Sequence, residues 1–220
     1  MDFPYKFIAI EGNIGAGKTT LCKILAELSE RELILEQFTD NPFLENFYRN
    51  QERFALQVEL FFLSERFKQL KDHEVNSNLF DQKFISDYIF VKSLLFAVGN
   101  LKGKELELYR RIYDALASSL PLPDIIFYLH RTPQQLLKLI KKRDRPYERE
   151  ITENYLEKIQ AAYFNYFSQL IKDIPVVIID TNDMEFEGNP DDLQYLLNIM
   201  QSTYTSGTHY IGREKGTLFD

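Results

Sequence analysis

Tryptophan is absent from this 220-residue sequence, and cysteine occurs only once, at Cys22. A single cysteine excludes an internal disulfide and a metal site built from several thiolates. No apolar run approaches the ~20 residues that a membrane-spanning helix needs. The N-terminus also lacks the pattern of a cleavable signal peptide. These absences predict a cytoplasmic protein with no membrane partner.

An excess of positive charge is absent as well. Lys and Arg total 26 against 33 Asp and Glu, which gives a net charge of −7. A general nucleic-acid binder needs a basic face, so this balance argues against one. An anionic ligand must then be bound by a local site, because the overall field repels it. The length and an apolar content of 45% are most simply those of one globular domain.

The most informative stretch is IAIEGNIGAGKTTL, residues 8–21. An apolar run predicts a buried strand, and a periodic segment from Lys18 predicts a helix. Between them the pattern G-x-x-x-x-G-K-[ST] is complete, so backbone N–H groups can point at phosphate oxygens. Lys18 can reach the outer phosphates of a triphosphate, and the Thr19 hydroxyl can ligate Mg²⁺. The predicted nucleotide-binding residues are Gly12, Asn13, Ile14, Gly15, Ala16, Gly17, Lys18, Thr19 and Thr20.

Short apolar runs alternate with longer helical patterns along the chain. Strands are predicted at 6–10, 33–36, 83–87, 125–129 and 176–180, and helices at about 18–30, 43–71, 88–118, 133–143, 152–172 and 190–203. This alternation predicts an α/β fold of the P-loop NTPase type, with a five-stranded parallel sheet, helices on both faces and a lid loop. Residues 1–203 would form one domain. Residues 204–220 would be a loose tail, or an arm ordered on a partner subunit.

Two carboxylates come at the ends of predicted strands. Open parallel sheets bind ligands at the carboxyl ends of their strands, where Glu36 and Asp87 lie. Beside a triphosphate, such a pair can serve as a base and a metal holder. Thr19 and Asp87 are therefore the predicted metal ligands. Taken singly, each carboxylate is equally typical of a cap on the following helix or turn.

A cluster of mixed charge, KKRDRPYERE, spans residues 141–150. Arg143 and Arg145 lie two residues apart, and Pro146 interrupts any helix there. Arginines on a loop that closes can clamp a transferring phosphate and shield it from water. Such a run is also typical of a solvated loop. Its place after the fourth strand favours a lid, with Glu148 supplying acceptor oxygens beside the arginines.

These stretches together resemble the deoxynucleoside kinase family over about residues 5–200. The resemblance is carried by EGNIGAGKTT, ILEQFTDNPFLENFY, RFALQVELFFLSERFKQL, RDRPYE and ITENYLEKIQAAYFNYF. It implies transfer of a phosphoryl group from ATP, with Mg²⁺, to the 5′-hydroxyl of a deoxynucleoside. It also implies a homodimer packed through the helices near 43–71 and 88–118. The sequence departs from the family at Gln37, where a proline is usual.

Carried over position by position, the resemblance implies a role for each site residue. Glu36 would take the proton of the 5′-hydroxyl, with Lys18 on the phosphates of the donor. Arg143 and Arg145 would neutralise the transferring phosphoryl group, and Tyr48 and Glu148 would hold the sugar 3′-hydroxyl. Asp87 matches the acidic residue of a motif that acts near Mg²⁺.

The arginine of that acidic motif is missing here, because Tyr88 occupies its place. This arginine helps to stabilise the reaction centre in relatives. Lys92, one helical turn further on, can supply a cation on the same helix face. We hypothesise that Lys92 compensates for the missing arginine.

Glu59 stands where the family has a glutamine that reads the base. A carboxylate presents only acceptors, whereas an amide presents a donor and an acceptor. Guanine offers adjacent N1–H and N2–H donors, so Glu59 favours a purine deoxynucleoside, deoxyguanosine above all. Arg66, seven residues later, would contact O6 or N7 of the purine. A structural contact between Glu59 and Arg66 is the alternative.

Phe90, Asp183 and Phe186 are further candidates for nucleobase contacts. Phe61, Phe62, Phe90 and Phe96 suit a stacking pocket and a core equally, and only Phe90 is assigned to the substrate. The stretch DTNDMEFEGNP lies where relatives enclose the donor adenine, which points to Asp183 and Phe186.

Two other functions compete with a deoxynucleoside kinase. A thymidylate-type nucleoside monophosphate kinase needs extra arginines for the phosphate already on its acceptor, and Arg49, Arg53 and Arg66 are available. A non-enzymatic module that binds nucleotide also remains open. A GTP switch would carry an Asn-Lys-x-Asp motif and an Asp-x-x-Gly motif, and the sequence contains neither.

Overall fold

The protein is described by a computed structural model that covers residues 1–37, 41–80, 82–169 and 173–212. Its centre is a sheet of six parallel strands in the order β2-β3-β1-β4-β5-β6. The strands are β1 (Phe7–Gly12), β2 (Glu32–Ile34), β3 (Phe84–Ser86), β4 (Ile125–His130), β5 (Pro175–Asp180) and β6 (Gly207–Ile211). The fold class is therefore the predicted α/β class.

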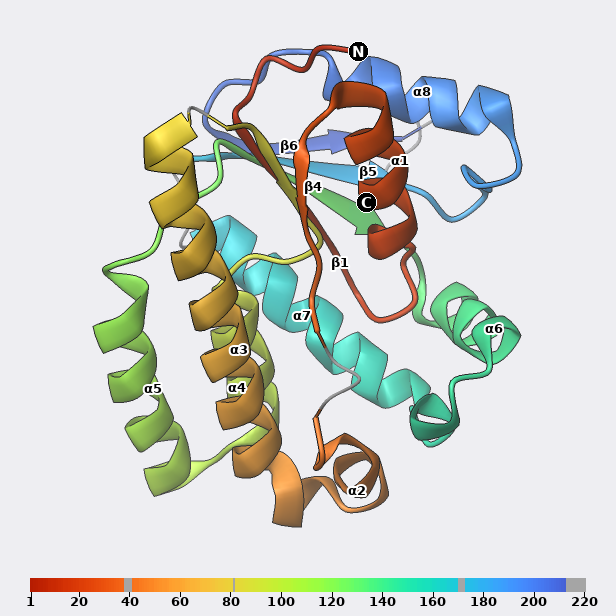
Figure 1. The fold of residues 1–220 in the computed structure, drawn as a ribbon. Helices are drawn as coiled ribbons and strands as arrows, with labels where there is room; N and C mark the ends of the chain where they lie inside the picture. The colour runs from red at the N-terminus through yellow and green to blue at the C-terminus, as the bar shows by residue number, and fades with distance from the viewer. Residues whose placement is uncertain (38–40, 81, 170–172, 213–220) are drawn as a thin grey trace.

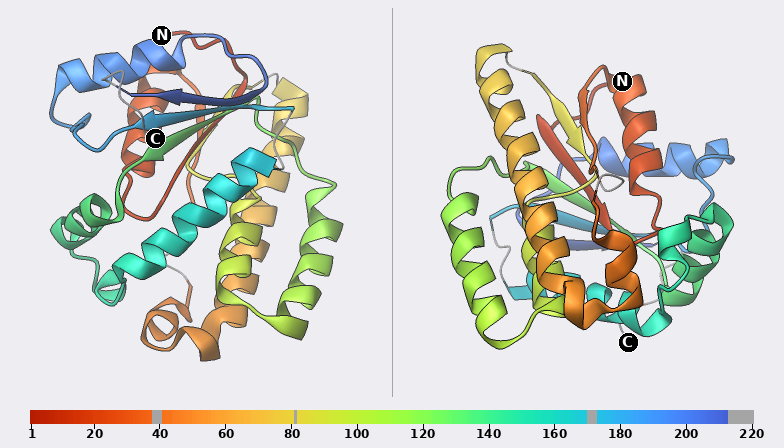
Figure 2. Two further views of the ribbon diagram at one scale, coloured as in Figure 1. Left: turned by 180° about the vertical axis from the view of Figure 1, so that it is seen from behind. Right: turned by 60° about the horizontal axis from the view of Figure 1, so that its bottom comes forward.

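Helices cover both faces of the sheet (Figure 1). They are α1 (Lys18–Ser29), α2 (Leu44–Arg49), α3 (Gln51–Phe80), α4 (Lys92–Asn100), α5 (Gly103–Ala117), α6 (Pro133–Arg143), α7 (Glu153–Gln169) and α8 (Pro190–Met200). A short 3₁₀ turn, η1 (Pro146–Glu148), follows α6. The two views of Figure 2 show α1 and α8 on one face and α3, α4, α5 and α7 on the other. No helix among the described residues is long and apolar enough to cross a membrane.

The central strands are buried on both faces, which explains their continuous apolar runs. Every residue of β1 and β4 is buried, and Ile8 of β1 lies in register with Ile85 of β3 and Ile125 of β4. Tyr128 on β4 packs against Tyr163 and Phe167 of α7, with ring centroids 5.1 and 5.3 Å away. These contacts fasten α7 to the sheet and thereby fix one wall of the site.

Two predicted helices are each divided in two. The segment predicted at 43–71 breaks at Asn50, whose φ of −149° and ψ of 84° are not helical, and then continues as the 30-residue α3. The segment predicted at 88–118 breaks at Leu101 and Lys102, both in extended backbone.

The prediction of a loose tail from residue 204 is wrong for residues 207–211. These residues form β6, the sixth strand, which pairs with β5 from Pro175 beside Gly207 to Ile179 beside Ile211. The physical reason is an open edge: β5 has backbone donors and acceptors left over, and β6 satisfies them. Residues 213–220 lie outside the described residues.

Candidate active site

The loop between β1 and α1 has the backbone that its glycines predicted. Gly15 and Gly17 adopt φ of +84° and +96°, a region that side chains disfavour. A Cβ added at Gly17 would lie 2.7 Å from Cζ of Phe186, so any larger residue would also have to displace this ring. Asn13 donates from Nδ2 to the Leu156 carbonyl at 2.8 Å, which ties the loop to α7. The loop therefore leads backbone N–H groups to the start of α1, as an anion cradle needs.

Lys18 is the first residue of α1, and its side chain folds back into this loop. Its ammonium donates to the carbonyl oxygens of Gly12 and Asn13, both at 2.9 Å. Burial, with Lys92 nearby, lowers the pKa of Lys18 to about 8, against the opposing pull of Glu11, Glu36 and Asp87. A bound polyanion would favour the charged ammonium further.

Asp87 directly follows β3 and binds both Thr19 of α1 and the backbone of Glu36, which follows β2. The two carboxylates predicted at the carboxyl ends of the strands therefore lie at one edge of the sheet. Oδ2 of Asp87 accepts from the Thr19 hydroxyl at 2.5 Å, and its Oδ1 accepts from the Glu36 backbone N–H at 2.7 Å. Asp87 and Thr19, the predicted metal ligands, therefore share one corner of the site. Their oxygens are the hard donors that Mg²⁺ takes together with substrate phosphates. Among the described residues no cluster of three or more His, Cys, Asp or Glu side chains could hold a metal alone.

The Glu36 carboxylate is held between two cations. Arg66 donates from Nε to Oε1 at 2.7 Å and from Nη2 to the same oxygen, while Lys92 donates to Oε2 at 2.6 Å. Burial alone would raise the pKa of Glu36, but Arg66 and Lys92 outweigh it and lower that pKa to about 2. Glu36 is thus an ionised acceptor whose orientation is fixed from two sides.

Arg66 lines the pocket and binds Glu36 and Ser93 rather than Glu59, while its contact with a purine base stays a prediction. It was assigned to a purine base, or else to Glu59, yet its donors reach Glu36 and, from Nη1, the Ser93 hydroxyl at 2.8 Å. The reason is electrostatic, because Glu36 stays ionised and offers the nearest charged acceptor. The lysine at position 92 does stand beside Glu36, as hypothesised. The Tyr88 hydroxyl donates to Oε1 of Gln69 at 2.7 Å and not to Glu36.

Glu59 is 1% exposed, and only one of its two carboxylate oxygens accepts a hydrogen bond from the described residues. Its Oε1 accepts from Nδ2 of Asn100 at 2.7 Å, whereas its buried Oε2 has no hydrogen-bond partner among the described residues. Burial raises the pKa of Glu59 to about 7, more than the Asn100 hydrogen bond and Arg66 lower it. An unsatisfied buried carboxylate oxygen is costly, so a ligand with a donor would gain from pairing with it.

We expect Glu59 to make stability depend on pH. Its pKa rises from 4.5 in the unfolded chain to about 7 in the fold, so ionisation is penalised in the folded state. The penalty is absent below about pH 4.5 and complete above about pH 7. Glu59→Gln should therefore raise the free energy of unfolding by about 3 kcal/mol at pH 8 and by less than half of that at pH 5.5. Urea unfolding at both pH values measures this, with the exposed Glu157→Gln of α7 as control. A loss of stability at pH 8 would contradict it.

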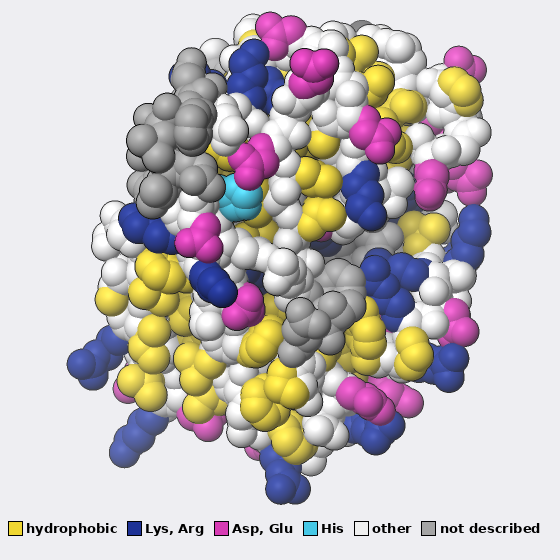
Figure 3. Space-filling model, viewed as in Figure 1, with side chains coloured by type: hydrophobic (Ala, Val, Ile, Leu, Met, Phe, Trp, Pro, Cys, Tyr) yellow, Lys and Arg dark blue, Asp and Glu magenta, His cyan; other side chains and the backbone are white. Residues whose placement is uncertain are grey.

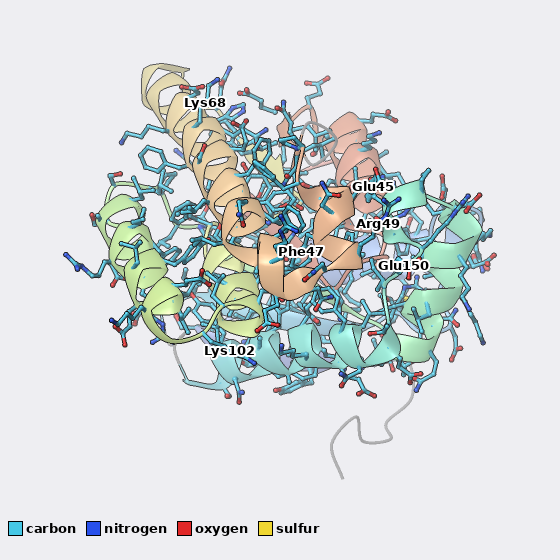
Figure 4. The ribbon with its side chains drawn as sticks, turned by 90° about the horizontal axis from the view of Figure 1, so that it is seen from below. Glu45, Phe47, Arg49, Lys68, Lys102 and Glu150 are labelled. Carbon is cyan, nitrogen blue, oxygen red and sulfur yellow. The ribbon has the colours of Figure 1, made fainter. Side chains whose placement is uncertain are left out.

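One pocket connects Glu59 with the phosphate loop. Its wall includes Lys18, Thr19, Glu36 and Asp87 as well as Glu59. Helix α2 closes the pocket from below: Phe47 faces inward, and the ion pair of Glu45 with Arg49 lies on the outer side of that helix (Figure 4). The pocket thus combines apolar walls, the polar contact at Glu59, and the charged residues beside the phosphate loop.

The aromatic prediction chose the wrong ring. Phe90 stacks on Tyr113 at 5.1 Å and lines a separate apolar cavity of about 70 Å³. Glu11 fixes the chain after β3, because its carboxylate accepts the Ile89 N–H at 2.8 Å. The side chain of the next residue, Phe90, is thereby turned toward α5. Phe62 and Phe96 line the pocket that contains Glu59 instead. Sequence alone assigned neither of them to it.

The lid arginines are paired with the residue predicted beside them. Arg143 donates from Nη2 to both oxygens of Glu148 at 2.7 Å, and Arg145 lies 3.5 Å from Oε1 of the same carboxylate. Glu148 is buried, and it shares the pocket wall with Tyr48, its predicted partner on the sugar. The structure therefore brings together the lid and the acceptor side. Lys and Arg side chains gather beside α6 in Figure 3.

A second cleft lies on the other side of the phosphate loop. It is lined by Gly15, Gly17, Thr20, Arg131 and Phe186, with Lys142 and Arg143 along the same wall. Arg131 sits 5.8 Å from the centroid of the Phe186 ring and donates to the Met184 carbonyl at 2.8 Å. Phe186 is thus where a donor base would lie, but Asp183 is exposed and does not line the cleft.

Sequence reasoning overlooked three residues, of which Arg131 and Tyr155 line these pockets and Asn100 binds Glu59 of the pocket wall. Arg131 directly follows β4 at the carboxyl end of the sheet, a position that could have marked it. Asn100 and Tyr155 meet Glu59 from α4 and α7, and Asn100 lies 3.3 Å from the Tyr155 hydroxyl. No local pattern in the sequence marks these two, because their meeting depends on how three helices pack.

Comparison with known proteins decides the family. The family model described as deoxynucleoside kinase matches residues 8–203. The chain belongs to the deoxynucleoside kinase family. Described residues from the phosphate loop, the long helix α3 and the lid of this kinase line the two pockets described above.

Individual relatives agree with this assignment. The kinase is 38% identical to a deoxyguanosine kinase of Bacillus subtilis (strain 168) over 191 residues, which cover 86% of this chain and 92% of the relative. It is 29% identical to a deoxyadenosine kinase of Dictyostelium discoideum, over 80% of this chain and 72% of the relative. A solved deoxyadenosine kinase from M. mycoides with bound dATP superposes with a TM-score of 0.75 at 24% identity, covering 90% of this chain and all of that one, and supports the fold.

Proposed function

We propose that this kinase transfers the γ-phosphoryl group of ATP to the 5′-hydroxyl of a purine deoxynucleoside, with deoxyguanosine favoured. The observation that carries the proposal is Glu59, which lines the acceptor pocket and whose buried Oε2 has no hydrogen-bond partner among the described residues. The 38% identity to a deoxyguanosine kinase supports the same reading. Nucleotide salvage is the cellular role that such a reaction serves.

Glu59 accounts for the base preference. As a carboxylate it offers Oε2 and a remaining lone pair on Oε1, which match the adjacent N1–H and N2–H donors of guanine. The cytosine and adenine edges place an acceptor beside a donor, so each leaves one acceptor facing another. A site built to hydrogen-bond one edge rejects a mismatched edge strongly, because buried groups are then left unpaired.

Glu36 is positioned to receive the proton of the 5′-hydroxyl. A carboxylate with a pKa of about 2 is a weak base, and in a loose phosphoryl-transfer transition state the nucleophile holds its proton until late. Its first task is therefore to accept a hydrogen bond from the hydroxyl and to orient it. Arg66 and Lys92 keep Glu36 ionised and aimed during that step.

The donor side of the proposal rests on the phosphate loop and the second cleft. Backbone N–H groups of residues 12–19 and the Lys18 ammonium would hold the phosphates of ATP. Thr19 and Asp87 would hold Mg²⁺, which supplies charge neutralisation to the phosphates when bound. The adenine would lie in the second cleft, against Arg131 and Phe186 of its wall. Arg143 and Arg145 would exchange Glu148 for the transferring phosphoryl group, and Tyr48 and Glu148 would bind the sugar 3′-hydroxyl.

The proposal is tested by substrate competition and by one substitution. An ATP-coupled assay across the four deoxynucleosides, deoxyuridine and thymidine monophosphate should give the highest kcat/KM with deoxyguanosine. Glu59→Gln should lower the ratio of kcat/KM for deoxyguanosine to that for deoxyadenosine by at least about 10³-fold, since the amide matches adenine. The exposed Glu157→Gln serves as control and should keep the ratio.

The competing functions give different results in the same assay. Equal efficiency with pyrimidine deoxynucleosides would contradict the purine preference. Turnover of thymidine monophosphate alone would assign the protein to the monophosphate kinases. ATP binding without turnover of any acceptor would favour a nucleotide-binding module. The proposed homodimer is supported by Val98 of α4 and Leu108 of α5, apolar side chains that are 43% and 49% exposed on the helices expected to pair.

A further inference from the structure

Asn100 is the last residue of α4 and binds Glu59 on α3. Its Nδ2 donates to Oε1 of Glu59 at 2.7 Å and lies 3.3 Å from the Tyr155 hydroxyl of α7. Three helices therefore meet at one amide nitrogen. The residue carries no charge and does not line the pocket that contains Glu59 and the phosphate loop, so its contribution acts through Glu59.

The hydrogen bond from Asn100 affects where a proton on Glu59 resides. An amide N–H can only donate, and a carbonyl oxygen accepts it more strongly than the hydroxyl oxygen of an acid does. The contact therefore favours a proton on Oε2, the oxygen without a partner among the described residues. The side chain has two presentations to a base: two acceptors when ionised, or a donor at Oε2 beside an acceptor at Oε1 when neutral.

These two presentations match two different purines. Guanine places N1–H beside the N2 amino group, which suits two acceptors. Adenine places the N1 acceptor beside the N6 amino donor, which suits a donor at Oε2 beside an acceptor at Oε1. Without Asn100 the proton could reside on either oxygen, and the neutral acid would have no fixed order of donor and acceptor.

We propose that Asn100 is a positioning residue that sets the base selectivity of Glu59, so that the ionised side chain selects deoxyguanosine and the protonated one selects deoxyadenosine. The proposal rests on the proposed function, because it assumes that Glu59 contacts the base. It goes further by making the selectivity depend on one proton and on one neighbouring amide.

The charges around Glu59 place this exchange near neutral pH. Arg66 on the same helix and Lys92 on α4 favour the ionised form, but both are committed to Glu36, which favours the protonated form. In the described part of the chain, the hydroxyls of Tyr155 on α7 and Tyr109 on α5 also interact with Glu59, and burial raises the pKa of each tyrosine. With no counter-ion of its own, Glu59 has a pKa of about 7.

The test is the ratio of kcat/KM for deoxyguanosine to that for deoxyadenosine between pH 5.5 and 8.5. Titrations of ATP, Glu36 and the lid act on both substrates and cancel in the ratio. We expect the ratio to fall about tenfold per pH unit as the pH falls, because each base uses one protonation state. Glu59→Gln should give a ratio that does not change with pH. A wild-type ratio that is constant over this range would overturn the proposal.

Asn100→Leu tests the positioning role. Loss of a hydrogen bond to the charged form should move the bend in the deoxyguanosine pH profile upward by about one unit. An unmoved bend in a folded variant would overturn the proposal. If Asn100→Leu does not fold, Asn100→Ser, which keeps a shorter donor, should shift the bend in the same direction, and an unmoved bend there would equally contradict us. Failure of the proposed function is distinguishable, since it would leave both purines without turnover at every pH.

Discussion

Glu36→Gln is expected to lower kcat about 10³-fold for any accepted deoxynucleoside while ATP still binds. The amide keeps the shape of the side chain but cannot take the proton of the 5′-hydroxyl. It also removes the negative charge between Arg66 and Lys92, which are 2.7 and 2.6 Å from the carboxylate. Single-turnover kinetics at saturating substrate measures the chemical step directly.

The same substitution should destabilise the fold, and the experiment must separate the two effects. Two buried cations left without their counter-charge cost about 3 to 5 kcal/mol. Activity is therefore measured well below the melting temperature of the variant, with ATP affinity as a check on folding. Glu45→Gln, on the outer side of α2, is the matched control and should keep full activity. A kcat within tenfold of wild type in folded Glu36→Gln would contradict the assigned role.

Lys92→Met is expected to lower kcat about 10²-fold, with a smaller change in KM. Methionine keeps the length and apolar body of the side chain but removes the ammonium that donates to Glu36 at 2.6 Å. A preorganised charged donor of this kind typically contributes that much to the reaction step. Tyr88, which stands where relatives have an arginine, cannot replace it because its hydroxyl is bound to Gln69. Steady-state kinetics with deoxyguanosine is the measurement.

Lys92→Arg should recover part of the activity, because it restores a cation within reach of Glu36. Lys68→Met is the matched control: Lys68 is exposed on the same long helix as Arg66 and is labelled in Figure 4. Its loss should leave kcat unchanged. If Lys92→Ala retained turnover within twofold of wild type, Lys92 would not compensate for the missing arginine.

The parts of the site that follow from local sequence were predictable. The phosphate loop needs only a strand, spaced glycines and a helix start, and these are neighbours in the chain. Glu36 and Asp87 could be placed together because parallel strands bring their carboxyl ends to one edge. The structure confirms that meeting, with Asp87 bound to both Thr19 and the Glu36 backbone.

The parts that depend on packing between distant helices were not predictable in the same way. Arg66 and Glu59 lie on one stripe of α3, and periodicity cannot say which of them meets Glu36. Asn100 reaches Glu59 only because α4 ends beside α3. Phe90 was misassigned because its direction is set by the Glu11 contact at Ile89, 78 residues away in sequence.

The last strand escaped prediction for a different reason. Residues 207–211 form a short edge strand whose side chains are mostly half-buried, so neither a continuous apolar run nor a strict alternation marks it. Its pairing partner, β5, lies some 30 residues earlier in the chain, beyond α8. Only the unpaired edge of β5 explains why this segment joins the sheet.

The position of β6 has a consequence for synthesis on the ribosome. Every other strand of the sheet precedes it in the chain, so β5 exposes a bare row of backbone donors and acceptors until β6 has emerged. During that interval the nascent chain presents a template that other nascent chains can pair with. A chain that ended shortly after α8 would still contain the residues of both pockets. Its unpaired β5 edge would make it prone to aggregate rather than to fold into an active enzyme.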